Sequence, residues 1–346
     1  MTWFSRRTGS GWHEPQTSPA SAGPGDAEEP KVEEPTELSA ASWWGAVKRV
    51  LSEFRDDDLA DRAAALTYYS VLSIFPAVLV VVSVVGLAGE SVSQSLVSNV
   101  GELAPGEVKQ VLTNAITELE RGRAGAGVAA VAGIAIAVWS ASKYVAAFMR
   151  ASNAIYDVAE GRPVWKTLPI RLAVTVTALV LLSLSAIAVV VTGGVAAKVG
   201  SLLGAGTVAV TVWDIAKWPV LLLVVSLLFA LLYWASPNAK QGFAWVTPGG
   251  VLALLLWLAA SGGFAVYVAA FNSYNKTYGS IAAVIIFLVW LWISNLALLL
   301  GAELNAELER GRHIAEGHPA TDEPYVELRD TRALPDHTMR DRFPNG

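Results

Sequence analysis

The residues of this chain that could do chemistry stand within or beside long apolar stretches. Near the start of the first stretch lie a cation, two phenols, a hydroxyl and an imino acid, namely Arg62, Tyr68, Tyr69, Ser73 and Pro76. A polar stripe beside a proline kink could line a cavity inside a membrane. Interfacial tyrosines and a tolerated kink explain the same pattern equally well, so both interpretations stay open.

Ionisable and amide groups also occur toward the end of the last apolar stretch. Asn295 is a polar position within it, Glu303 lies at its end, and Glu307 follows one helical turn later. Ionisable groups at membrane depth are functional candidates by default. Arg62 is a candidate partner for Glu303. An ion pair that fixes helix ends and a proton or ion site are equally consistent with this arrangement.

A short polar segment separates the last two apolar stretches. It reads FNSYNKTYG over residues 271–279 and contains Asn272, Tyr274 and Tyr278. These amide and phenol groups could bind a ligand on the outer side. Asn and Gly are also typical of tight turns, so a hairpin that makes the flanking helices an antiparallel pair is the simpler interpretation.

The side chains that most enzymes require are missing or misplaced. The chain has no cysteine, and all four histidines (His13, His313, His318 and His337) lie in its terminal segments. Phosphate-binding loops, dinucleotide fingerprints and nucleophile elbows are absent. We therefore expect no catalytic residue, no metal site, no cofactor and no enzymatic activity. The net charge of −5 and pI of about 5.5 also predict no nucleic-acid partner.

Composition and block length indicate the fold class. Of 346 residues, 53% are hydrophobic and 16% are charged, against about 25% charged in soluble domains. A helix needs about 20 apolar residues to cross a bilayer core of about 30 Å, and the backbone of such a span must be hydrogen-bonded internally. We predict an all-α polytopic membrane protein with six transmembrane helices, at about 63–88, 126–148, 169–195, 213–235, 246–271 and 280–303.

The segments outside the apolar blocks are of two kinds. Residues 1–42 and 312–346 are rich in charged residues and proline, and we expect both to be disordered cytoplasmic tails around the 43–311 transmembrane domain. Residues 43–62 and 107–119 instead place apolar side chains at helical spacing. These two segments are predicted to be amphipathic helices at the membrane interface.

The distribution of basic residues predicts the orientation, because short cytoplasmic loops carry excess lysine and arginine. With the N-terminus inside, the inner segments hold ten basic residues and the outer segments five. The inner ten are Lys48, Arg49, Arg55, Arg62, Arg150, Arg162, Lys166, Lys240, Arg310 and Arg312, and the outer five are Lys109, Arg121, Arg123, Lys198 and Lys276. This favours a multi-pass protein of the plasma (inner) membrane with both termini in the cytoplasm.

Several segments together resemble the YihY / virulence factor BrkB family. They read RAAALTYYSVLSIFP at 62–76, RASNAIYDV at 150–158, SPNAK at 236–240, and a block from Gly249 to Glu307 that ends in LLGAELNAE. The resemblance covers about residues 45–310. It implies a six-span inner-membrane protein, and transport is often suggested for the family. Some members were once labelled ribonuclease BN, and one is linked to resistance to serum killing.

Two classes of function remain after these observations. The first is a transporter or exporter of an unidentified small solute or lipid-like molecule, with the lipid bilayer as its environment and a homo-oligomer left open. The second is a scaffold that organises the envelope without transporting anything, which the interfacial helices favour. A ribonuclease is disfavoured, because an acidic surface repels RNA and no spaced histidine and carboxylate ligands occur.

Overall fold

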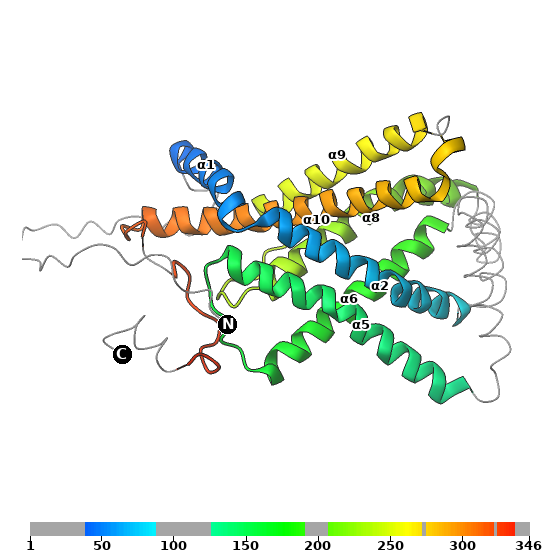
Figure 1. The fold of residues 1–346 in the computed structure, drawn as a ribbon, viewed down its shortest axis with the longest axis horizontal. Coiled ribbons are helices and arrows are strands. Elements are labelled where there is room, and N and C mark those ends of the chain that lie inside the picture. The colour runs from blue at the N-terminus through cyan, green and yellow to red at the C-terminus, as the bar shows by residue number, and fades with distance from the viewer. Residues whose placement is uncertain (1–38, 88–125, 191–206, 272–274, 322–323, 336–346) are drawn as a thin grey trace, which may run out of the picture.

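The chain folds into a bundle of helices, shown in Figure 1. The computed structural model describes residues 39–87, 126–190, 207–271, 275–321 and 324–335. The helices are α1 (Ala40–Asp56), α2 (Leu59–Leu87), α5 (Ala126–Ile155), α6 (Val164–Val190), α8 (Thr207–Ala235), α9 (Pro248–Phe271) and α10 (Asn275–Ala315). Within these ranges, β pairing is limited to one bridge between Ala239 and Leu328. The predicted all-α fold class is confirmed.

Four of the described helices are long and apolar enough to cross a membrane. These candidate spans are Val164–Ala186, Val208–Ala235, Pro248–Tyr267 and Val284–Ala315. They correspond to the last four predicted spans. The first two predicted spans coincide with α2 and α5, which have 29 and 30 residues. The structure thus supports a polytopic membrane protein.

The last two spans pack against each other along their length. α9 and α10 contact each other extensively and run in opposite directions in Figure 1, as expected for an antiparallel pair. The helices are closest where Gly249 of α9 meets Gly301 of α10. A Cβ on Gly301 would collide with the carbonyl of Gly249, with the Tyr233 hydroxyl, and with the Ala253 methyl group at 2.8 Å. Two glycines therefore allow the two backbones to touch.

The predicted amphipathic helix at 43–62 is interrupted in the structure. α1 ends at Asp56 and α2 begins at Leu59. Asp58 has a left-handed φ of 51°, and its carbonyl accepts the first helical hydrogen bonds of α2, from the amides of Asp61 and Arg62 at 3.0 Å. Aspartate tolerates this conformation better than most residues and is a good helix N-cap. The run of three aspartates therefore turns the chain between α1 and α2.

α10 continues well beyond the predicted end of its span. It has 41 residues, so it is about 60 Å long and exceeds the hydrocarbon thickness. Its last turns are amphipathic rather than apolar, and they bury Leu304 and Leu308 against Ala46 and Val50 of α1. The tertiary contact with α1 maintains a helix that hydropathy alone would end near 303.

The C-terminal part of the chain differs from the predicted disorder. Residues 324–335 pack against the domain, with Tyr325 only 4% exposed. The amide of Lys240 donates to the carbonyl of Glu327 at 2.7 Å, and the amide of Arg329 donates to the carbonyl of Asn238 at 2.9 Å. The charged composition predicted disorder, but tertiary contacts order the segment: backbone hydrogen bonds to the α8–α9 loop and the buried ring of Tyr325.

Some predictions lie outside the described residues. Residues 1–38, the expected helix at 107–119, Asn272 and Tyr274 belong to this group. Tyr278 falls in the first turns of α10, so the predicted turn at 271–279 is shorter than expected.

The glycine contact leads to a stability prediction. Gly301→Ala should lower stability by about 1–3 kcal/mol, because the new methyl group forces α9 and α10 apart. Gly262→Ala is the matched control, since a Cβ there meets nothing within 4 Å, and it should be neutral or stabilise α9 by up to about 1 kcal/mol. Thermal unfolding of both variants in detergent measures the difference. Equal midpoints for the two variants would contradict the close packing.

Candidate functional site

Two carboxyl groups from distant parts of the chain face each other at one end of the bundle. Asp57 lies in the turn between α1 and α2, and Glu303 lies on α10. Their side chains approach closely enough to share a hydrogen bond. Glu303 is only 1% exposed, and its Oε2 atom is buried without a hydrogen-bond partner. The pair thus brings a buried acid against a second acid.

The next acid along α10 has a different environment. The carboxylate of Glu307 pairs with the guanidinium of Arg49, which also donates to the Glu307 carbonyl at 3.0 Å. Arg310 adds a second cation 3.6 Å from Glu307, and it also lies 3.6 Å from Glu53. Glu307 is therefore neutralised by two arginines. Glu303, one turn earlier, instead faces carboxyl groups.

This arrangement favours a bound proton on the pair. Two carboxylates in contact away from water repel each other strongly, so they do not both ionise easily. For Asp57, which lies outside the spans, burial raises the pKa to about 7, and the charges of Asp157 and Glu53 act in the same direction against the opposing charge of Arg62. One proton shared between Asp57 and Glu303 relieves this repulsion.

A polar cleft of about 440 Å³ lies between the end of α8, the α8–α9 loop and the last turns of α10. Its walls combine aromatic rings with ionic and amide groups. The polar and aromatic lining residues are Tyr156, Tyr233, Trp234, Lys240, Gln241, Phe243, Thr247, Asn305, Glu309 and Arg312. Ligand sites typically have such an apolar body with a few convergent polar groups.

Tyr156 lines the cleft and is also affected by the charge of Glu303. It follows α5 directly and is 4% exposed. Its hydroxyl is 3.4 Å from Oε1 of Gln241. Burial raises the pKa of Tyr156 above its ordinary range, and the charges of Glu309 and Glu303 act in the same direction. The phenol therefore stays neutral and lies within the electrostatic reach of Glu303.

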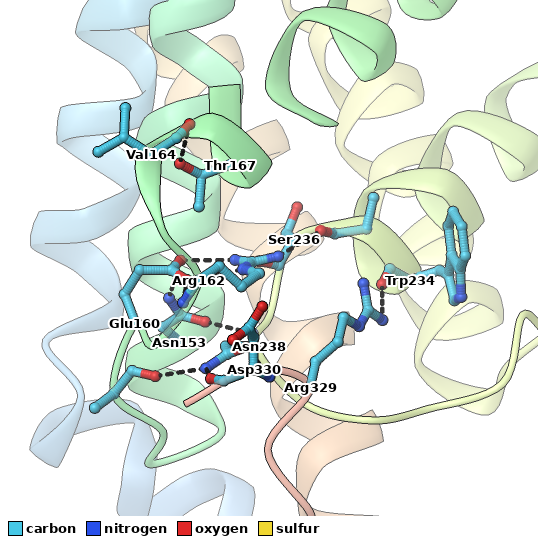
Figure 2. A network of polar contacts seen from close by, with 12 residues as sticks. Asn153, Glu160, Arg162, Val164, Thr167, Trp234, Ser236, Asn238, Arg329 and Asp330 are labelled. Carbon is cyan, nitrogen blue, oxygen red and sulfur yellow. Dashed lines mark hydrogen bonds and ion pairs between the residues drawn. The ribbon is translucent and has the colours of Figure 1, made fainter. Parts of the chain in front are cut away.

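A hydrogen-bonded network, shown in Figure 2, fixes the loops around the cleft. Arg162 is its centre, with a side chain only 1% exposed. It makes two 2.7 Å hydrogen bonds to the carboxylate of Glu160 and donates to the carbonyls of Ala235 and Ser236 at 3.2 and 2.7 Å. Burial opposes ionisation of Glu160, but Arg162 and the Asn153 amide outweigh it and hold its pKa below the usual range.

Asn238 extends this network to the C-terminal segment. Its backbone amide donates to Oδ1 of Asn153 at 2.7 Å. Its side-chain Nδ2 donates to the carbonyls of Ala159 and Asp330 at 3.0 and 2.8 Å, and its Oδ1 accepts from the amide of Asp330 at 3.1 Å. One fully bonded amide thus joins the α5–α6 loop, the α8–α9 loop and the segment after α10 into a rigid frame.

The residues singled out in the sequence have different environments. Arg62, the expected partner of Glu303, instead donates to the backbone carbonyl of Asp57 at 2.5 Å. The side chain that faces Glu303 is the carboxyl group of Asp57. Asn295 joins three helices, because it accepts from Tyr144 of α5 at 2.9 Å and donates to Thr67 of α2 at 3.1 Å.

The polar stripe on α2 does not act as one surface. Tyr68 is 61% exposed on the outside of the bundle, whereas Tyr69 is half-buried. The hydroxyl of Ser73 donates to the carbonyl of Tyr69 within the same helix at 2.7 Å. Pro76 lies inside α2, which continues to Leu87. The structure brings neither Tyr68 nor Ser73 to the cleft.

Sequence reasoning missed several residues of this region. Asp57 was hidden in a run of three aspartates that looks like a solvated surface. Asn153, Tyr156 and Asn238 stand in the segments RASNAIYDV and SPNAK. Asparagines in short segments between predicted spans were an available signal, because such amides often hold loops together.

A helical bundle with several membrane-length helices, buried acids and a polar cleft at one end defines a polytopic membrane protein. The model of the Virulence factor BrkB family matches residues 50–325, and the chain belongs to this family. The resemblance seen in the sequence is therefore confirmed.

Curated relatives cover most of the chain. A ribonuclease-like protein named YfkH, from Bacillus subtilis (strain 168), is 29% identical over 274 residues, which are 79% of this chain and 98% of YfkH. A UPF0761 membrane protein of Vibrio vulnificus (strain CMCP6) is 29% identical over 306 residues, 86% of this chain and 92% of its own. A UPF0761 membrane protein of Alkalilimnicola ehrlichii is 31% identical over 282 residues, which are 78% of this chain and 60% of that longer protein. No solved structure matches the chain.

The environment of Asp57 predicts a pH dependence of stability. A carboxyl group whose pKa rises from 3.8 to about 7 on folding binds a proton more tightly in the folded state. Stability should therefore fall as pH rises from about 4 to about 7 and change less above that range. Asp57→Asn should reduce this fall by about half or more. Asp61→Asn, an exposed acid at the start of α2, is the control and should leave the fall unchanged in thermal unfolding curves.

Proposed function

We propose that this protein is a six-span transporter of the inner membrane, which moves a small polar or amphiphilic solute through its helix bundle with both termini in the cytoplasm. α2 and α5 supply the two further spans, because helices of 29 and 30 residues exceed the length needed to cross a bilayer. Six spans place the α1–α2 turn, the α5–α6 loop, the α8–α9 loop and the end of α10 on the same side.

The contacts in the structure agree with this topology. Arg49 of α1 reaches Glu307 of α10, and Arg162 of the α5–α6 loop reaches the end of α8. These segments gather at one end of the bundle in Figure 1. The excess of basic residues in the same segments supports a cytoplasmic location for this end.

The cleft is the observation that carries the proposal of transport. It brings ionic and amide groups, among them Lys240, Gln241, Asn305 and Arg312, to the end of helices that are otherwise apolar. A polar solute could enter there from the cytoplasm without crossing lipid. The buried Glu303, on the same helix as Asn305 and Arg312, is a second polar group among apolar helices.

A scaffold that organises the envelope is the alternative, and the surface of α1 favours it. Trp44 and Leu51 of this helix are 62% and 71% exposed. Such a helix can bind a membrane surface or a partner helix.

We also propose that the protein is not an enzyme, and that the ribonuclease-like name of YfkH does not describe the activity of the present chain. RNA cleavage by purified protein that a point substitution abolishes would overturn that part.

Cysteine labelling tests the orientation, because the native chain has no cysteine. In intact cells an impermeant maleimide should label Gly204→Cys, in a segment expected outside, and should not label Gly242→Cys of the α8–α9 loop until the membrane is opened. Gly242 suits the purpose because an added side chain meets nothing within 4 Å. Gly161 is unsuitable, since a Cβ there collides with the backbone of Asp330. The reverse labelling pattern would overturn the orientation.

Flux through the reconstituted protein tests transport. Proteoliposomes should take up or release members of a broad panel of labelled solutes and lipids. Lys240→Gln and Arg312→Gln should each slow this flux by about tenfold to a hundredfold, because a charged hydrogen bond to a ligand contributes about 1.5–3 kcal/mol. Lys48→Gln is the control, since Lys48 is exposed on α1 outside the cleft.

The same proteoliposomes separate transport from scaffolding. Absence of flux for every solute in the panel would contradict the transporter. If a deletion phenotype is restored by both cleft variants but not by a Trp44→Ser and Leu51→Ser variant, the scaffold is the better description.

A further inference from the structure

We propose that Asp57 and Glu303 form a proton-binding site, whose loading holds the α1–α2 turn against α10 and whose unloading releases it. The use of this site as an energy input rests on the transport function proposed above. The binding of the proton itself does not rest on that function, because it depends only on the two carboxyl groups and their surroundings.

The first argument is the unmet hydrogen-bonding capacity of Glu303. The side chain is 1% exposed, and Oε2 has no hydrogen-bond partner although it is buried. A carboxylate is costly to bury in this state, whereas a carboxylic acid carries no charge and can donate its proton to a facing oxygen. Asp57 supplies that oxygen, since the two side chains lie within hydrogen-bonding reach.

The second argument is the charge of the groups around the pair. They come from every element that packs against it. Counted together with Asp57 and Glu303, five carboxyl groups face three guanidinium groups. The surrounding groups are Arg49 and Glu53 on α1, Arg62 on α2, Tyr156 and Asp157 after α5, Glu307 and Arg310 on α10, and Tyr325 in the C-terminal segment. The arginines Arg49 and Arg310 are already engaged with Glu307. Taking up one proton reduces the remaining negative charge.

The occupant is a proton rather than a metal ion. Divalent cations need several oxygen ligands that converge at short distance. In the part of the chain that the structure describes, no three acidic or histidine side chains are arranged to hold a metal ion. Two facing carboxyl groups, in contrast, can share one proton without any further ligand.

The position of Asp57 gives the proton a mechanical effect. Asp57 belongs to the two-residue turn between α1 and α2, followed by Asp58 in its left-handed conformation. With the proton bound, one O–H···O hydrogen bond ties this turn to α10. When the proton leaves to water, two carboxylates repel each other and the turn moves away from α10. Glu303 then becomes accessible from the side of Tyr156, which also lines the cleft.

Infrared spectroscopy of the purified full-length protein in lipid nanodiscs tests the site directly. The wild type should show the C=O stretch of a protonated carboxyl group that disappears as pH rises between about 5 and about 9. Glu303→Gln and Asp57→Asn should each remove this titrating band or shift the pH at which it disappears, because the remaining carboxyl group stays partly or fully buried but no longer faces a second charge. Asp61→Asn should keep it. An unchanged band in both variants would overturn the proposal.

A second measurement on the wild type does not depend on how the variants fold. Dicyclohexylcarbodiimide is an apolar reagent that reacts with protonated carboxyl groups in apolar surroundings. Mass spectrometry should find its adduct on Glu303, and labelling should fall by about tenfold or more as the pair loses its proton at high pH. Labelling that does not change with pH, or that sodium ions suppress at constant pH, would overturn a proton site, the latter in favour of a cation site.

The outcomes for the site and for transport are distinguishable. If the band and the labelling titrate as expected but proteoliposomes move nothing, the proton site stands and the transporter does not. If flux is observed but Glu303 is ionised throughout, transport stands without this site. If both hold, Glu303→Gln should abolish the dependence of flux on a pH gradient while Asp61→Asn retains it.

Discussion

The cost of placing charge away from water dominates this structure. Apolar helices long enough to cross a membrane leave few places for an ionised group, and each one inside must be paired, hydrogen-bonded or neutralised by a proton. Glu307 is neutralised by arginines from α1 and α10. Glu303, one turn deeper, faces Asp57 instead. The difference between these two acids on one helix accounts for both the firm attachment of α1 and the instability of the ionised pair beside it.

The sequence could predict the helices because their cause is local. A membrane span requires only a long enough run of apolar residues. The predicted blocks from 126 to 303 therefore agree with the observed helices within several residues, except at the end of α10. The end of α10 and the break at Asp57 could not be located in this way. The last turns of α10 depend on contact with Ala46 and Val50 of α1, and the break depends on a backbone conformation within a run of like residues. Both are tertiary or conformational effects that hydropathy does not contain.

The candidate site was predictable only in part for the same reason. Glu303 is recognisable from its depth in an apolar stretch, whereas its partner is not, because Asp57 is 246 positions away in a segment that looks solvated. Asn295 was recognised as a polar position, but its bonds to Tyr144 and Thr67 follow from how three helices meet. The charged C-terminal segment gave no sign of order, since its order depends on backbone hydrogen bonds and on contacts with Asn238 and Lys166, which are far away in the sequence.

Rigid and strained polar groups lie side by side at this end of the bundle. Arg162 and Asn238 have their hydrogen bonds satisfied by carbonyls and side chains of three segments, and a network of this kind resists displacement. The carboxyl pair has an unmet acceptor and a repulsion that only a proton removes. Because the frame of loops is fixed, a change of charge at the pair cannot be absorbed by a general loosening of the bundle. The effect of the charge change is instead concentrated at the α1–α2 turn, where two residues connect one helix to the next. A directed movement of this turn therefore requires the rigid network around it.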